Sequence, residues 1–65
     1  MPKYPNVEVD LSNTDGNAFS IMGAVRKAMR RANCDKKEID AFLDEATSGD
    51  YDNLLKVVYE TVEVV

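Results

Sequence analysis

Residues 14–33, TDGNAFSIMGAVRKAMRRAN, decide the fold because they combine a turn, a long amphipathic pattern and a group of cations. From residue 18 onward, small and apolar residues recur at the three-and-four spacing of a helix with one buried face. These residues are Ala18, Ile21, Met22, Val25, Ala28, Met29 and Ala32. The pattern predicts a helix from residue 18 to about residue 32. Asp15 or Asn17 is the expected N-cap, and Asn33 suits the left-handed position that follows a helix.

Two further helices are expected in residues 33–61. Asp35 and Glu38 have the spacing of an acidic capping box, which predicts that a second helix starts there. Its buried face would hold Ile39, Phe42, Leu43 and Ala46. Gly49 ends this pattern, and Asp50 is placed to cap a shorter third helix. The apolar face of that helix would hold Tyr51, Leu54, Leu55 and Val58.

Both ends of the chain have the alternation of β-strands. In NVEVDLS, residues 6–12, apolar and polar residues alternate, with Val7, Val9 and Leu11 on one side. Residues 60–65, ETVEVV, predict a short closing strand with Val62 and Val64 on one face. The two prolines predict that residues 1–5 are irregular.

These elements predict a single α+β domain over residues 1–65, in the order β-α-α-α-β. Two strands cannot stand alone in water, so we expect the two short terminal strands to lie side by side, packed against the three helices. The pattern leaves their relative direction open. A chain of 65 residues with one cysteine cannot be held by an internal disulfide, so packing or self-association must stabilise it. We expect a homodimer or larger assembly, because two strands leave exposed edges.

Charge and length exclude several partners. The net charge is −4, but residues 1–34 carry +2 and residues 35–65 carry −6. Nucleic acid is therefore a disfavoured partner, since its binding needs a dominant cationic surface. No stretch has the apolar length of a secretory signal or a membrane span, so we expect a cytoplasmic protein without a membrane partner.

The residue types disfavour catalysis. The absence of histidine removes imidazole acid–base chemistry and the usual nitrogen ligands of zinc. Cys34, the single cysteine, is interpreted as a small connector between two helices. Asp40, Asp44 and Glu45 share one side of the second helix, but neither their spacing nor the acidic turns match a calcium loop. We interpret them as a solvated acidic face, paired in part with the cations of the first helix. We therefore expect no enzyme activity, cofactor or metal.

One arc of the first helix is the candidate binding site. It lies beside the apolar stripe and holds Phe19, Gly23, Arg26, Lys27 and Arg30. An aromatic ring beside arginines suits a nucleobase and a phosphate. The alternative is structural, because cations near a helix C-terminus complement its dipole. In that interpretation Phe19 packs under the incoming chain, and Gly23 lets another helix or subunit approach.

The stretches DGNAFSIMGAVRKAMRRA (15–32) and IDAFLDEATSGDYDNLL (39–55) resemble a group of very short, uncharacterised bacterial, prophage and phage proteins. The resemblance covers about residues 6–64 and implies a phage-related setting, but it transfers no site residue. Our first hypothesis is a non-enzymatic interaction module of phage or prophage type that binds a host or phage macromolecule. The alternative is a small-ligand binder that captures a nucleotide or other anion on Phe19, Arg26 and Arg30.

Overall fold

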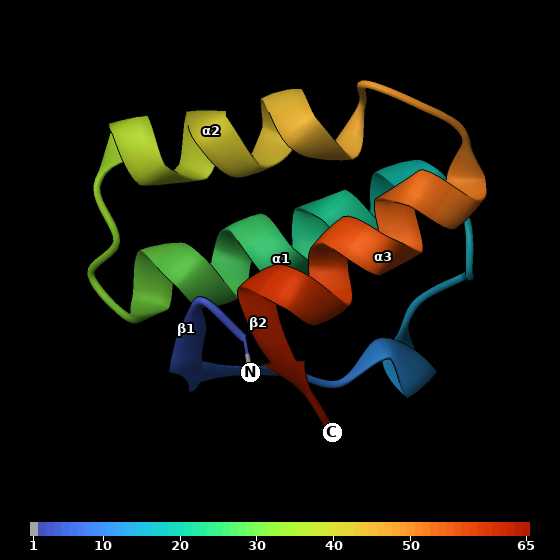
Figure 1. Cartoon of the computed structure of the whole chain (residues 1–65). Coiled ribbons are helices and arrows are strands. Elements are labelled where there is room, and N and C mark those ends of the chain that lie inside the picture. The colour runs from blue at the N-terminus through green and yellow to red at the C-terminus, as the bar shows by residue number, and fades with distance from the viewer. Residues whose placement is uncertain (1) are drawn as a thin grey trace.

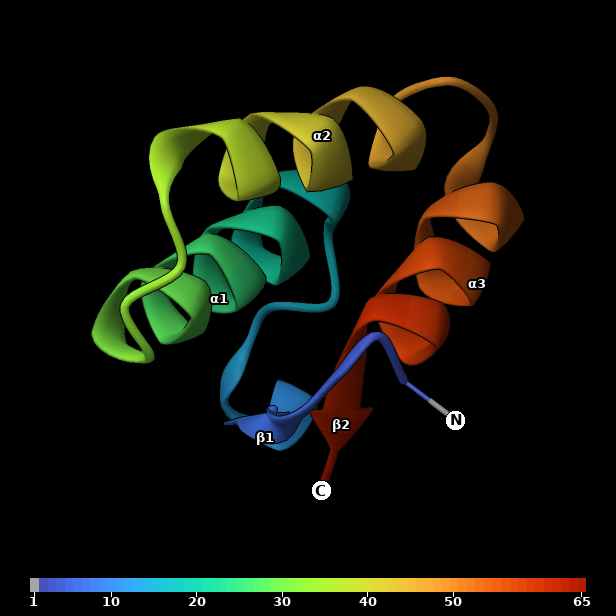
Figure 2. The ribbon, with the colours of Figure 1, turned by 60° about the vertical axis from the view of Figure 1, so that its left-hand side comes forward.

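The computed structural model describes residues 2–65 and confirms the α+β domain of order β-α-α-α-β (Figure 1). The strands are β1 (Tyr4–Val9) and β2 (Val62–Val64). The helices are α1 (Ala18–Arg31), α2 (Lys36–Ala46) and α3 (Tyr51–Thr61), and a short 3₁₀ helix, η1 (Leu11–Asn13), follows β1. The sheet forms one layer, α1 and α3 lie on it, and α2 lies over α1 and α3 (Figure 2).

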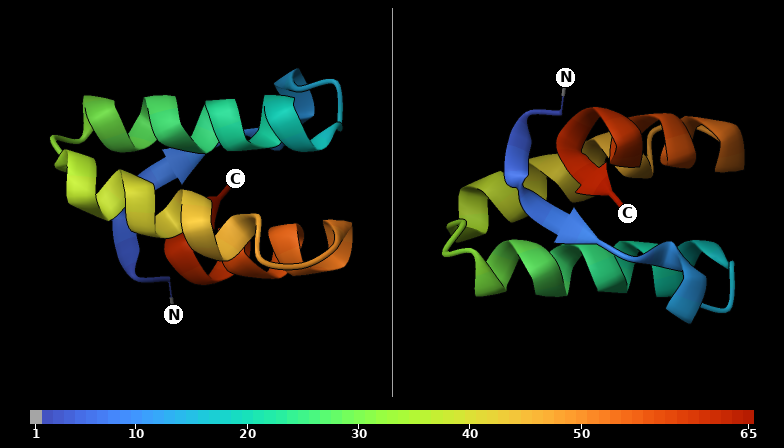
Figure 3. Two further views of the ribbon diagram at one scale, coloured as in Figure 1. Left: turned by 90° about the horizontal axis from the view of Figure 1, so that it is seen from above. Right: turned by 90° about the horizontal axis from the view of Figure 1, so that it is seen from below.

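The two strands pair in parallel, which settles the direction that the sequence left open. Tyr4 lies opposite Val62, and Glu8 lies opposite the next residue, Glu63, so residues 5–7 form a bulge in β1. The strand changes direction there (Figure 3). Proline has no N–H group to donate to a strand ladder, and it is therefore tolerated at such bulges.

The start and the end of β1 differ from our expectation. Tyr4 and Pro5 were expected to be irregular, but they belong to β1, and the Lys3 N–H donates a hydrogen bond of 2.8 Å to the Glu60 carbonyl. Leu11 was expected to continue the strand, but it begins η1. The reason is the side chain of Asp10, which caps η1 by accepting a hydrogen bond of 2.9 Å from the Ser12 N–H.

The ends of α1 form as the sequence predicts. The side chain of Asn17 is the N-cap and accepts a hydrogen bond of 2.8 Å from the Ser20 N–H. Past the last turn, Asn33 adopts a positive φ of 68°, the left-handed conformation that asparagine tolerates. The Cys34 N–H then donates to the Met29 carbonyl at 2.9 Å, which satisfies one of the free carbonyl groups at this end.

The caps of α2 and α3 are also confirmed. Asp35 accepts a hydrogen bond of 2.9 Å from the Glu38 N–H, and the Glu38 side chain accepts one of 3.0 Å from the Asp35 N–H. Asp50 caps α3 by accepting from the Asn53 N–H at 3.0 Å. Each cap satisfies N–H groups that a helix leaves unpaired at its start.

The core lies where the three helices meet the sheet. Its buried residues are Val7, Val9, Ile21, Val25, Met29, Ile39, Phe42, Ala46, Leu54, Val57, Val58 and Val62. Complete burial of a side chain such as Val25 or Met29 contributes about 1.5–3 kcal/mol. Across residues 2–65, every helix falls short of the length and apolar character needed to span a bilayer.

Candidate functional site

The candidate arc lies on the side of α1 that faces away from the core. The Phe19 side chain is 85% exposed, so it does not pack under the chain that enters from β1. Arg26, Lys27 and Arg30 are also exposed. A Cβ atom added at Gly23 would meet no atom within 4 Å outside its own stretch of α1, so a close neighbour does not require glycine at this position. Phe19 therefore does not pack under the incoming chain, and Gly23 is not needed to make room for another helix of the described chain.

Three of the five arc residues come together around a small hollow of about 180 Å³. This hollow is lined by Phe19, Met22, Gly23, Arg26 and Leu43. Lys27 is separated from it and lines another hollow, on the side of α1 that faces β1. Arg30 lines neither hollow and follows Arg26 by four residues, which is about one helical turn. The site around this hollow therefore includes fewer residues of α1 than the arc that we predicted from the sequence.

The arginines of the arc make no ion pair with the rest of the described chain. Within residues 2–65, one ion pair closer than 4.0 Å is present, between the Lys36 Nζ and Asp40 Oδ2 atoms of α2, at 3.1 Å. The expected pairing between the cations of α1 and the acidic face of α2 is therefore absent from this part of the chain. Since neither Arg26 nor Arg30 has such a partner, both guanidinium groups are available to an anionic group from outside.

The hollow beside Phe19 has a neighbour at the junction of α1 with the end of α2 and the start of α3. A second hollow, of about 290 Å³, shares Met22 with the first. Its lining residues are Ala18, Met22, Ala46, Thr47, Gly49, Asp50, Tyr51 and Leu54. The Tyr51 hydroxyl donates a hydrogen bond to the Gly16 carbonyl, which fixes this end of the junction. We call the two hollows together the α1–α2 groove.

Met22 and Leu43 are the residues of this groove that sequence reasoning assigned to the core alone. Both are half-buried and pack against the core with one part of the side chain. Met22 lies three residues after Phe19, so the helical spacing does place the two side chains on neighbouring positions. The contribution of Leu43 depends on how α2 crosses α1, which no local pattern reports.

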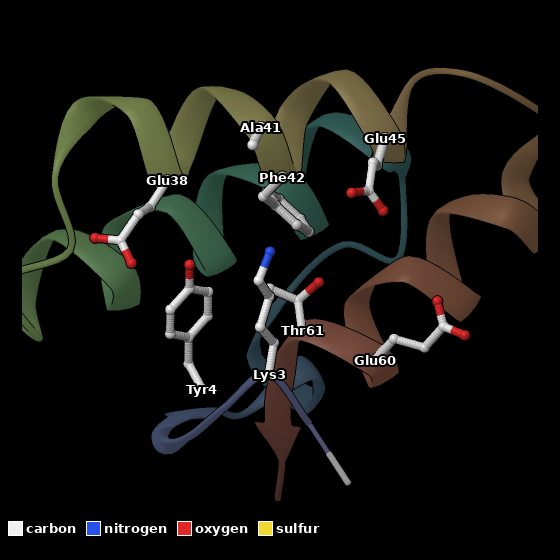
Figure 4. A pocket seen from close by; sticks show the side chains of 8 residues that line it. All are labelled: Lys3, Tyr4, Glu38, Ala41, Phe42, Glu45, Glu60 and Thr61. Atoms are coloured by element: carbon white, nitrogen blue, oxygen red, sulfur yellow. The ribbon is translucent and has the colours of Figure 1, made fainter.

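A separate pocket of about 220 Å³ lies between α2, α3 and the start of β1 (Figure 4). It is lined by Lys3, Tyr4, Glu38, Ala41, Phe42, Glu45, Glu60 and Thr61. The Tyr4 hydroxyl points toward Glu38, and the Lys3 side chain extends into the space below Phe42 (Figure 4). No sequence pattern indicated this pocket, because Lys3 and Tyr4 belong to the segment that was expected to be irregular.

The side chains of this pocket link β1 to α2 through Tyr4 and Glu38. The interaction of the Tyr4 hydroxyl with the Glu38 carboxylate, followed by burial, raises the pKa of Tyr4 to about 12. The hydrogen bond from the Asp35 N–H, followed by the interaction with the Tyr4 hydroxyl, lowers the pKa of Glu38. The Lys3 Nζ atom lies 5.9 Å from the centroid of the Tyr4 ring. Lys3, Tyr4 and Glu38 thus line one pocket and interact electrostatically between the N-terminal segment and α2.

Neither the lone thiol nor the acidic face offers an activated group. Cys34 is half-buried, and burial raises the pKa of its thiol, which disfavours the reactive thiolate. Among residues 2–65, no group of three or more Asp, Glu or Cys side chains is arranged to hold a metal ion.

Comparison with known proteins gives no match: no protein-family model, curated protein or solved structure is similar to this chain. Of the surfaces described here, the arc with its groove has an exposed aromatic ring and cations without ion-pair partners.

Proposed function

We propose that the protein is a non-enzymatic interaction module that binds a protein partner through Phe19, Arg26 and the α1–α2 groove. The observation that supports this proposal most directly is the position of the Phe19 ring, which is 85% exposed. It lies beside an apolar hollow and near arginines that make no ion pair with the described chain. Burial of a phenylalanine side chain contributes about 1.5–3 kcal/mol, and here a partner would have to supply that burial. Aromatic residues and arginine are also the types that most often dominate binding at protein interfaces.

The size of the hollow favours a protein over a small ligand. Each of the two hollows, at about 180 and 290 Å³, is smaller than the roughly 300–1,000 Å³ of sites that enclose small molecules, and Met22 is the one lining residue that they share. A nucleotide held by Phe19, Arg26 and Arg30 would keep one face of its base in solvent. A protein surface, in contrast, covers a shallow hollow and its rim together. The small-ligand alternative is therefore kept as an outcome of the test.

The setting of the interaction is part of the proposal. The resemblance to short phage and prophage proteins supports an accessory role toward a host or phage macromolecule. The excess of negative charge in residues 35–65 disfavours nucleic acid as that macromolecule. A single cysteine, which forms no internal disulfide, supports a cytoplasmic location.

We also propose self-association, because each strand of the two-stranded sheet leaves one edge without a neighbouring strand. Light scattering over a concentration series should give a mass of twice 7.3 kDa or more. A mass of one chain at high micromolar concentration would contradict it.

The test compares matched charge changes on two surfaces. The arc variants are Phe19→Ala and Arg26→Gln/Arg30→Gln. The control is Lys37→Gln/Lys56→Gln, which removes the same charge from exposed positions on α2 and α3. Each protein is immobilised and exposed to a nuclease-treated lysate of the organism that encodes the chain. We expect the wild type and the control to retain the same protein, and both arc variants to lose it.

Two other results contradict the proposal. Equal retention by all four proteins would show that the arc is not the binding surface. A nucleotide or other anion that co-purifies with the wild type in native mass spectrometry, and is lost from both arc variants, would favour the small-ligand alternative instead.

A further inference from the structure

The α1–α2 groove has the length of a short helix. From Ala18 to Arg26 the two hollows follow eight residues of α1, or about 12 Å. About two turns of a partner helix would cover that distance, and Arg30 follows one turn beyond Arg26. The floor is apolar over most of its length, with Ala18, Met22 and Leu43 half-buried and accessible.

The walls of the groove favour a helix over an extended peptide. An extended segment pairs its backbone N–H and carbonyl groups with a strand edge, and the hollow beside Phe19 is lined by residues of the helices α1 and α2. The backbone groups in the middle of a helix are already hydrogen-bonded within it. An extended peptide would therefore lose hydrogen bonds to water without replacement, which is costly. A helix satisfies its own backbone and needs only side-chain contacts.

The charges of the groove differ between its two ends. Arg26 lines one end, and Arg30 follows it on the same side of α1. At the other end the lining includes Asp50, whose carboxylate caps α3. A partner with carboxylates at both ends would meet repulsion at Asp50. Charge complementarity therefore favours acidic residues at one end of the partner segment only.

On these grounds we infer that the partner presents an amphipathic helical segment with apolar residues at helical spacing and carboxylates at one end. Its apolar residues lie over Met22 and Leu43, and its carboxylates pair with Arg26 and Arg30. The inference rests on the proposed function and specifies its partner. Recognition of this kind uses anchors at positions i, i+3 or i+4, and i+7 of the bound helix.

A display library of random 16-residue peptides tests the inference without knowledge of the natural partner. The library is selected on the immobilised wild type, and the enriched peptides are sequenced and measured one by one. We expect apolar residues at helical spacing with acidic residues gathered at one end. Affinity should fall roughly tenfold for Arg26→Gln/Arg30→Gln and should stay within about twofold for Lys37→Gln/Lys56→Gln. It should also fall as salt is raised.

Gly23→Gln separates loss of binding from loss of fold. A Cβ atom at Gly23 meets no neighbour within 4 Å, and Gly23 lines the hollow, so the new side chain starts in open space at the edge of the hollow. Replacement of a glycine within a helix also favours helix formation. This variant should melt at or above the temperature of the wild type and yet lose the selected peptides. Unchanged peptide binding by Gly23→Gln would overturn the inference.

Other outcomes of the selection are equally decisive. No enrichment, or enriched peptides that are basic, extended or insensitive to the two arginines, would overturn the inferred partner class. If peptides of another kind bind and are lost from Phe19→Ala, the proposed function stands and this inference fails. If the natural partner is retained equally by the arc variants, the proposed function fails whatever the library yields.

Discussion

The inner and outer faces of α1 belong to the same 14 residues, yet they have opposite relations to the fold. Ile21, Val25 and Met29 on the inner face are 2%, 0% and 0% exposed, whereas Phe19 on the outer face is 85% exposed. The inner residues pack against the sheet and the other helices, and the outer ones end in solvent. The fold thus accounts for the inner face alone, and the aromatic and cationic side chains outside are free to bind a partner.

The largest expected effect is on the inner face. Met29→Ala removes a completely buried side chain and should lower the free energy of unfolding by about 2–5 kcal/mol. In a domain of 65 residues this is a large share of the total stability. Urea denaturation measures this loss of stability. Met29→Leu is the volume-matched control and should cost less than about 1.5 kcal/mol. A loss below about 1 kcal/mol for Met29→Ala would mean that α1 is not anchored at this position.

The end of α1 should show a smaller effect. Asn33 has a φ of 68°, which alanine adopts only with strain. Asn33→Ala should therefore cost about 1 kcal/mol, while Asn33→Gly should cost none, because glycine adopts this conformation freely. Thermal or urea unfolding of the two variants gives the comparison. Equal stability of both would argue against the left-handed end.

The interaction between Tyr4 and Glu38 should make the stability of the protein depend on pH in the alkaline range. The pKa of Tyr4 is raised from 10.0 to about 12 in the folded chain, so the protonated hydroxyl is favoured by folding. The stability that this gives is complete below pH 10 and is lost as the pH rises toward 12. Urea unfolding should therefore show a steeper alkaline loss for the wild type than for Tyr4→Phe. Parallel curves for the two proteins would show that the contact does not form.

The parts that the sequence predicted are those that depend on residues close together in the chain. The capping box of Asp35 and Glu38, the cap at Asn17 and the left-handed Asn33 each need only local hydrogen bonds or backbone sterics. Helical spacing was likewise enough to place the exposed Phe19 outside the core. These features needed no knowledge of how the helices pack.

The parts that were missed depend on contacts between distant segments. Tyr4 joins β1 because Val62 lies opposite it, and the pocket of Figure 4 forms because α2 and α3 meet there. In the same way, Leu43 lines the groove because α2 packs beside α1. No local pattern reports where two helices meet, and the sequence therefore located the arc but not the groove.

The smallest expected effect tests the central claim, that the outer face of α1 is not needed for folding. The variant Phe19→Ala/Arg26→Gln/Arg30→Gln changes three exposed side chains. Its free energy of unfolding in urea should stay within about 1 kcal/mol of the wild type. A small loss is expected because Arg30 lies in the last turn of α1, where its charge interacts favourably with the helix dipole. A loss as large as that of Met29→Ala would contradict the claim, because it would mean that the outer face is part of the core.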